Sequence, residues 1–214
     1  MHSKRQCTVF QLHRISKLLP VHWPHARLLA ILTTLFFSSD LFAEDWKVPD
    51  LMRLLSQNKS GQAVFVEKKF IGILDKPLVS SGELSFNAPD RLEKRTLKPK
   101  SEVLLLEGEK LTINQADKRS FSIQLQDQPE IASIVSSIRG TLLGDLAALE
   151  KTFQLKLSGS MAQWQLVLTP LDSSVSKIMT RISIRGSEAD IRAIHFEQAD
   201  GDRSEMQISK MTTQ

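Results

Sequence analysis

Residues that carry reactive chemistry are scarce in this sequence. Its 214 residues include one cysteine, five histidines and no tyrosine, and His195 is the only histidine beyond residue 43. A single thiol cannot form an internal disulfide, and no cluster of His, Cys or carboxylates has the spacing of metal ligands. The Gly-x-Ser-x-Gly elbow and the glycine-rich phosphate loop are also missing. We therefore expect a protein that is not an enzyme and that binds no cofactor or metal.

The first 43 residues are typical of an export signal. Five Lys and Arg residues precede a short apolar run at 28–37, and Leu-Phe-Ala at 41–43 is typical of a cleavage site. The apolar run is shorter than the roughly 20 residues of a membrane-spanning helix, although an uncleaved anchor is the alternative. We predict a signal peptide over 1–43, cleaved near Ala43, and a single domain over 44–214 in the periplasm.

Charge of one sign is also lacking once this leader is set aside. The leader contains five of the 28 Lys and Arg residues and one of the 24 Asp and Glu residues, which leaves 23 of each sign. Binding to a phosphate backbone depends on clustered basic residues. We therefore exclude nucleic acid as a partner.

Period-2 alternation dominates the remaining chain and predicts a mainly β fold. Within 80–99, Leu84 and Phe86 alternate with polar residues, and a turn at 87–90 joins two antiparallel strands. Further strands are predicted at 62–71, 102–113 (a hairpin that turns at Gly108), 119–125, 153–157, 163–168, 178–184, 191–197 and 203–209. About ten short strands at this spacing indicate one large antiparallel sheet or a barrel.

Two segments show helical periodicity instead. Leucines at helical spacing predict a helix over 45–60 that stops at Gly61. Large apolar residues recur every three or four positions over 129–153. Because glycine disfavours a helix interior by about 1 kcal/mol relative to alanine, we expect two helices that meet near Gly140, or one kinked helix.

His195 is the sole histidine that could serve a catalytic triad. It alternates with Ile194 and Phe196, which predicts that it lies on the opposite face of its strand, toward solvent. A hydrolase that uses His195 is therefore kept only as an alternative.

The charged run at 90–96, Asp-Arg-Leu-Glu-Lys-Arg-Thr, allows two interpretations. One is a solvated strand face on which opposite charges pair. The other is a rim, formed by Arg91, Lys94 and Arg95, that meets an anionic lipid head or a membrane partner. Lys94 could then lie along an apolar surface by its stem and keep its ammonium at an opening.

The order of elements and several motifs resemble the LolA-like superfamily, periplasmic carriers of outer-membrane lipoproteins. The resemblance is strongest over 82–113, with Gly-Glu-Leu-Ser-Phe-x-x-Pro-Asp at 82–90 and the hairpin motif at 103–113. It is strong again over 164–209, which includes the closing Asp-Gly-Asp hairpin at 200–202. More narrowly, 80–97 together with Arg-Gly-Thr-Leu-Leu-Gly-Asp-Leu at 139–146 is similar to the LolA-related branch associated with aryl-polyene or other acyl-product export.

This resemblance implies an unclosed antiparallel half-barrel of about ten to eleven strands, covered by an N-terminal helix and a central helical lid. Acyl chains would occupy an apolar cavity between sheet and helices, where each buried methylene contributes about 0.8 kcal/mol. The implied lining is Phe65, Leu84, Phe86, Leu92, Leu104, Leu106, Phe121, Ile123, Trp164 and Leu166 from the sheet, with Ile131, Ile134 and Ile138 from the lid. For each of these residues the alternative is ordinary core packing.

The function that the resemblance implies is that of a periplasmic carrier, which takes acyl chains of a lipoprotein or lipid-like product toward the outer membrane. Its expected partners are this cargo, an inner-membrane donor and an outer-membrane acceptor, and we expect a monomer. A sensing or interaction module that binds a regulatory protein is the alternative on the same fold.

Two positions depart from the pattern of the lipoprotein carriers. Ala88 stands where those proteins have an arginine that latches the lid helix, and Leu92 lies near the aromatic residue that contacts their membrane partner. A lipid-like product is therefore expected as cargo at least as readily as a lipoprotein.

Overall fold

A single antiparallel sheet of eleven strands forms the framework of the protein. The computed structural model describes residues 46–116 and 119–211. The strands lie in the order β6-β5-β4-β3-β2-β1-β11-β10-β9-β8-β7. The predicted signal peptide over 1–43 lies outside the described residues.

The first six strands form one half of the sheet and the last five form the other. The bounds are β1 (Ser60–Phe70), β2 (Leu78–Asn87), β3 (Arg91–Lys98), β4 (Glu102–Glu107), β5 (Lys110–Gln115) and β6 (Phe121–Gln124) for the first half. They are β7 (Phe153–Ser160), β8 (Gln163–Pro170), β9 (Met179–Ser187), β10 (Asp190–Gln198) and β11 (Arg203–Lys210) for the second. Consecutive strands in each half pair as antiparallel hairpins, and Gly108 supplies the positive φ of 59° that the β4–β5 turn requires.

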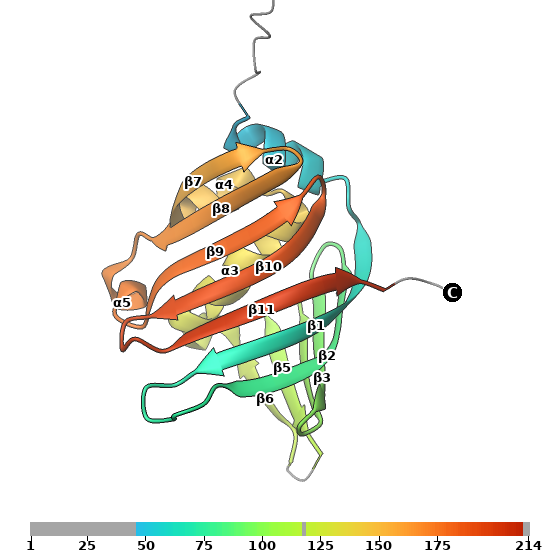
Figure 1. Ribbon diagram of the computed structural model, residues 1–214, viewed down its shortest axis with the longest axis vertical. Coiled ribbons are helices and arrows are strands. Elements are labelled where there is room, and N and C mark those ends of the chain that lie inside the picture. Colours follow the sequence, from blue (N-terminus) through green and yellow to red (C-terminus); the bar gives the residue numbers. More distant parts are fainter. Residues whose placement is uncertain (1–45, 117–118, 212–214) are drawn as a thin grey trace, which may run out of the picture. The chain divides into compact units, whose positions relative to one another are not determined.

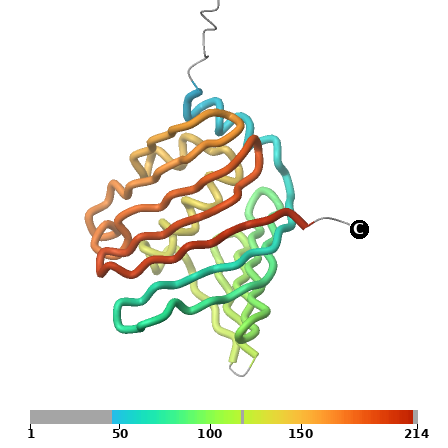
Figure 2. Tube along the Cα trace, viewed as in Figure 1, coloured from blue at the N-terminus to red at the C-terminus, as the bar shows by residue number. Residues whose placement is uncertain are grey.

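The two halves join where β1 pairs with β11, from Ala63 opposite Lys210 to Phe70 opposite Arg203. Figure 2 shows these two strands, from opposite ends of the described chain, running side by side through the middle of the sheet. The outer strands β6 and β7 do not pair with each other, so the sheet stays open. The predicted unclosed, mainly β half-barrel is confirmed, with eleven strands.

Four α-helices and one short 3₁₀ helix complete the described chain: α2 (Val48–Leu55), η1 (Leu125–Asp127), α3 (Pro129–Leu143), α4 (Leu146–Thr152) and α5 (Ser173–Ser176). The chain leaves the sheet at the edge strand β6, passes through η1, α3 and α4, and returns at the opposite edge strand β7. In Figure 1, α3 and α4 lie on one side of the curved sheet, behind β7 to β10. The helical segment therefore lies across the inner, concave face of the sheet.

Two helix boundaries differ from those expected. The first helix ends at Leu55, and Gly61, expected as its stop, lies inside β1, opposite Phe86. The break in the long helical segment comes at Gly144, which has a φ of 65°, while Gly140 is an ordinary position within α3. Gly140 is required for space: a Cβ there would lie 2.8 Å from the Cδ2 atom of Leu149.

Two further elements differ from the predicted pattern. β6 is only four residues long, and Leu125, the last residue of the strand predicted over 119–125, begins η1 and is buried there. The connection after β8, where no helix is predicted, contains the short helix α5. The Asp172 side chain caps its first turn, 2.7 Å from the Ser174 backbone nitrogen.

The packed core lies under the second half of the sheet. Strands β7 to β9 turn apolar side chains toward α2, α4 and α5. The fully buried residues of this cluster are Leu51, Leu149, Leu166, Leu168, Ile182 and Ile184, with Leu55, Phe153 and Trp164 at 1–2% exposure.

Candidate functional site

The first half of the sheet, together with β10 and β11, borders a cavity instead of a packed core. Its volume is about 520 Å³, within the range of roughly 300–1,000 Å³ typical of ligand pockets. One wall comes from β1 to β5, a second from β10 and β11, and α3 covers both. The apolar side chains that line it are Leu55, Ala63, Leu84, Phe86, Leu92, Leu104, Leu106, Leu111, Ile134, Val135, Ile138, Leu142, Ala189, Ile191, Ile194, Phe196, Met206 and Ile208.

Small side chains on α3 explain why the cavity is not filled. The buried positions of this helix are all small: Ser133, Ser137, Gly140 and Thr141. The larger Ile134 and Ile138 are only half-buried and line the cavity. The Ser137 hydroxyl donates to the Ile134 carbonyl at 2.6 Å, and the Thr141 hydroxyl donates to the Ser137 carbonyl at 2.7 Å. These bonds satisfy the hydroxyls without an outside partner. The helix therefore packs closely on its small-residue side and presents its large apolar side chains to an open space.

One polar group is built into the apolar wall. The Glu67 carboxylate is 5% exposed and accepts hydrogen bonds from the Lys94 ammonium and the Ser204 hydroxyl, both at 2.5 Å. Burial alone would raise the pKa of Glu67, but the charge and hydrogen bond of Lys94, the Ser204 hydroxyl and the charge of Lys69 together lower it below its ordinary 4.5. The cavity therefore contains an ionised pair with no net charge.

The exposed end of the cavity is polar. Ser60, Gly61, Gln62 and Lys210 line it and are exposed to solvent. The Lys210 ammonium pairs with Asp190 at 2.6 Å, and the Asn58 amide donates to the Ala189 carbonyl at 2.9 Å across the start of β1 and the β9–β10 turn. A long apolar molecule can thus enter the cavity from this end.

Seven of the thirteen predicted lining residues meet at this cavity. They are Leu84, Phe86, Leu92, Leu104, Leu106, Ile134 and Ile138. Phe65, Trp164 and Leu166 are at most 2% exposed and do not line it. Trp164 and Leu166 belong to the packed core under the second half of the sheet, because α2 and α4 cover that part of the concave face.

The other three predicted lining residues lie outside the cavity. Phe121 is 51% exposed on the edge strand β6. Ile123 is half-buried on the same short strand, and Ile131 is half-buried in the first turn of α3; neither lines the cavity. Contact of any of the thirteen residues with a ligand stays a prediction.

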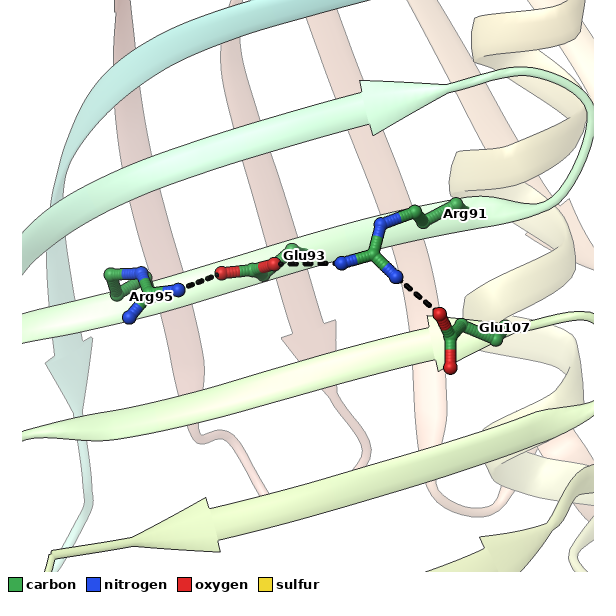
Figure 3. A network of polar contacts seen from close by, with 4 residues as sticks. All are labelled: Arg91, Glu93, Arg95 and Glu107. Carbon is green, nitrogen blue, oxygen red and sulfur yellow. Dashed lines mark hydrogen bonds and ion pairs between the residues drawn. The ribbon is translucent and has the colours of Figure 1, made fainter.

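Arg91, Lys94 and Arg95 do not form one rim. Successive residues of a strand point to opposite faces, so Lys94 lies inside with Leu92, while Arg91 and Arg95 lie on the outer face. Figure 3 shows them in a row with two acids: Arg95 pairs with Glu93 at 2.6 Å, Glu93 with Arg91 at 3.3 Å, and Arg91 with Glu107. Arg91 and Arg95 therefore fit the first of the two interpretations, a solvated strand face on which opposite charges pair.

Sequence reasoning missed Glu67 as the partner of Lys94, and Ser204 as a second hydrogen-bond donor to Glu67. A signal was present, because Glu67 follows Phe65 at the spacing of one strand face and replaces an apolar residue there. The partnership itself could not be read from the sequence, since Ser204 is 137 residues away and meets Glu67 only through the β1–β11 pairing.

The family model described as "Outer membrane lipoprotein carrier protein LolA-like" matches residues 43–212. This chain belongs to that family. A curated relative, an outer-membrane lipoprotein carrier protein of Dechloromonas aromatica (strain RCB), is 26% identical over 181 residues, which cover 83% of each chain.

Two solved structures are similar to this LolA-like chain at low identity. A LolA superfamily protein of Nitrosomonas europaea aligns over 79% of this chain and 95% of its own length, with 10% identity and a TM-score of 0.41. The MucA/MucB complex of Pseudomonas aeruginosa aligns over 76% of this chain and 56% of the matched chain, with 12% identity and a TM-score of 0.43.

His195 of this LolA-like chain lies away from the cavity. It is half-buried on the face of β10 opposite to Ile194 and Phe196, as predicted. The Arg185 guanidinium donates to its Nε2 atom at 3.0 Å. Burial and the charge of Arg185 lower the pKa of His195, against the opposing charges of Glu205 and Glu197. The imidazole is therefore neutral, and its Nε2 atom accepts the hydrogen bond from Arg185.

Two other features were searched for in the described ranges 46–116 and 119–211. These ranges contain no group of three or more His, Cys, Asp or Glu that could hold a metal ion. No helix within them is both long enough and apolar enough to cross a membrane.

Proposed function

We propose that this LolA-like protein is a non-enzymatic periplasmic carrier that holds acyl chains of a lipoprotein or lipid-like product in the cavity under α3. The observation that carries the proposal is the cavity itself: about 520 Å³, lined mainly by leucine, isoleucine and phenylalanine, and open at a polar end. Burial of methylenes in such a space is favourable at about 0.8 kcal/mol each and needs no directional contact.

Family membership and the name of the Dechloromonas relative support a carrier role. The leader pattern at 1–43 supports export, and the family match supports transfer toward the outer membrane as part of this proposal. An inner-membrane donor, an outer-membrane acceptor and a monomeric state complete the proposal. With Ala88 in place of the latching arginine, the cargo is proposed to be a lipid-like product at least as readily as a lipoprotein.

The first test is lipid analysis of the gently purified protein by mass spectrometry. We expect an acylated molecule to copurify. Protein without lipid but with a tightly bound protein partner would favour the sensing module instead. Retained lipid binding by His195→Ala is expected and would remove the hydrolase alternative.

The cavity is tested by placing a charge in it. Leu92→Glu and Ile134→Glu each put a carboxylate where acyl chains would lie, and we expect both variants to lose copurified lipid while keeping the circular dichroism of the sheet. Leu97→Glu is the matched control, because Leu97 is in the same strand as Leu92, is 50% exposed and does not line the cavity. Unchanged lipid content in both cavity variants would contradict the proposal.

A further inference from the structure

Lys94 occupies an unusual place for a lysine, in the middle of a leucine wall. Its register partners on the two neighbouring strands are Leu84 in β2 and Leu104 in β4, and all three residues line the cavity. The side chain is only 21% exposed. Lysine is almost never buried in apolar surroundings unless an opposite charge pairs with it, and here Glu67 is that partner.

Glu67 and Lys94 differ in how many of their hydrogen-bonding groups already have partners. The Glu67 carboxylate already accepts from Lys94, from Ser204 and, at 3.5 Å, from Ser80. The Lys94 ammonium has three N–H groups. One donates to Glu67, the Phe65 ring centroid lies 5.0 Å from the nitrogen, and no other hydrogen bond of Lys94 occurs among the described residues. What the pair can still offer to a ligand is therefore donors.

We propose that the Lys94 ammonium binds an uncharged hydrogen-bond acceptor of the cargo, an ester or amide carbonyl at the head of an acyl chain. This proposal rests on the carrier function and names a group that the cargo must contain. A plain hydrocarbon would leave the remaining N–H groups unsatisfied once it displaces water, which costs binding free energy.

The charge balance of the pair selects a carbonyl over a carboxylate. Glu67 already neutralises Lys94 at 2.5 Å, so a second anion at the ammonium would face the Glu67 charge across a space of low dielectric constant. A neutral acceptor gains a charge-assisted hydrogen bond without that repulsion.

The position of the buried Glu67 carboxylate, to which the Lys94 ammonium donates, favours the same choice. At the exposed end of the cavity, Ala63 in β1 is the register partner of Lys210. Glu67 lies four residues further along β1, which is about 13 Å at the rise of a β-strand. A group bound there must leave water behind, and this is far less costly for an ester than for an ionised carboxylate.

The experiment measures displacement of the apolar dye N-phenyl-1-naphthylamine by methyl laurate, laurate and dodecane, which differ only in the head group. We expect wild-type protein to bind methyl laurate about tenfold more tightly than dodecane, and more tightly than laurate. In Lys94→Met the affinity for methyl laurate should fall to that for dodecane, while dodecane binding stays unchanged.

Two further variants keep the test decisive if Lys94→Met folds poorly with Glu67 unpaired. The double variant Glu67→Gln/Lys94→Met removes both charges while Gln keeps its bond to Ser204, and it should show the same loss of ester preference. Glu67→Gln alone leaves Lys94 without its counter-ion and should shift the preference toward laurate by about tenfold.

The outcomes separate this inference from the carrier function. Equal binding of methyl laurate and dodecane by wild type, or an ester preference that survives loss of Lys94, overturns the inference and leaves the carrier function standing. A wild-type preference for laurate overturns the choice of an uncharged head. If none of the three molecules displaces the dye, the carrier function fails and the inference fails with it.

Discussion

The two halves of the sheet have the same kinds of apolar side chain on their concave face. In one half these side chains form a packed core, and in the other they line a cavity. Under β7 to β9, leucine, isoleucine, phenylalanine and tryptophan pack against α2 and α4 and are fully buried. Under β2 to β5, leucine and phenylalanine border a space of about 520 Å³. The strands alternate in the same way in both halves, so the difference lies in what covers them.

What covers the first half is α3, placed by its small residues. Gly144 lies where a Cβ would come within 2.0 Å of the Met52 carbonyl oxygen in α2, and Gly140 makes room for Leu149 in α4. The close approach on this side draws α3 toward the packed half. Ile134 and Ile138 are half-buried, pack against the edge of the core cluster and line the cavity that remains beside the first half of the sheet.

The largest expected contrast is between matched leucines of the two halves. Leu166→Ala removes a fully buried side chain and should lower the free energy of unfolding by about 2–5 kcal/mol, because it loses burial and leaves a new void. Leu104→Ala should cost about 1 kcal/mol, because that side chain already borders empty space. Urea unfolding measures both, and equal losses would contradict the contrast between the halves.

The next largest effect on stability is expected at the contact between Gly144 and Met52 that positions α3. Gly144→Ala forces a Cβ onto a residue with a φ of 65° and against Met52, and should destabilise the protein by about 2 kcal/mol or more. Gly61→Ala is the control, because nothing lies within 4 Å of a Cβ there, and it should be nearly neutral. Thermal unfolding measures the stability of the two variants. If Gly144→Ala were as stable as the wild type, this contact would not position α3.

The buried pair gives a smaller and pH-dependent effect. At pH 7, Glu67→Gln should cost about 1–2 kcal/mol, because a hydrogen bond to a charged group is replaced by one between weaker partners. The folded-state pKa of Glu67 is lowered from 4.5, so the stability that its charge contributes is present above pH 4.5 and is lost as the pH falls through the folded-state pKa. Urea unfolding of both proteins from pH 7 to pH 3 should therefore show a difference that shrinks only below about pH 4.5. A difference that grows on acidification would contradict the ionised pair.

The outer face should give the smallest effect. Arg91→Ala breaks ion pairs whose arginine is 42% exposed, so it should change the free energy of unfolding by less than about 1 kcal/mol and leave ligand binding unaltered. Arg95→Ala is the matched variant from the same row of charges. A loss of lipid binding in either would show that the outer face takes part in cargo uptake.

Much of the fold could be predicted from the sequence, because strand alternation and turn residues are local signals. The predicted hairpins around Gly108 and Gly201 are present, and the strand limits agree closely over most of the sheet. The cavity could be predicted only in part. Leu104 and Leu166 look alike in sequence, since both are leucines on the concave face of a strand that is not at the sheet edge. They differ in the helices that cover them: α3 lies over the cavity, and α2 and α4 lie over the packed core.

The position of α3 depends on long-range contacts between small residues, which leave no periodic apolar signal. The separation of Lys94 from Arg91 and Arg95, by contrast, was available from the sequence. Lys94 shares its strand face with Leu92, and the two arginines share the other. Treating the three cations as one rim ignored that alternation.

The most direct test of the account is methyl NMR of the protein, labelled at Leu and Ile, during titration with a fatty-acid methyl ester that carries a nitroxide on its chain. We predict that paramagnetic broadening affects the methyl groups of Leu84, Leu92, Leu104, Ile134 and Ile138 and spares those of Leu166, Leu168, Ile182 and Ile184. Broadening that is absent from the first set, or that is equal in the two sets, would contradict a lipid-holding hollow beside a packed core.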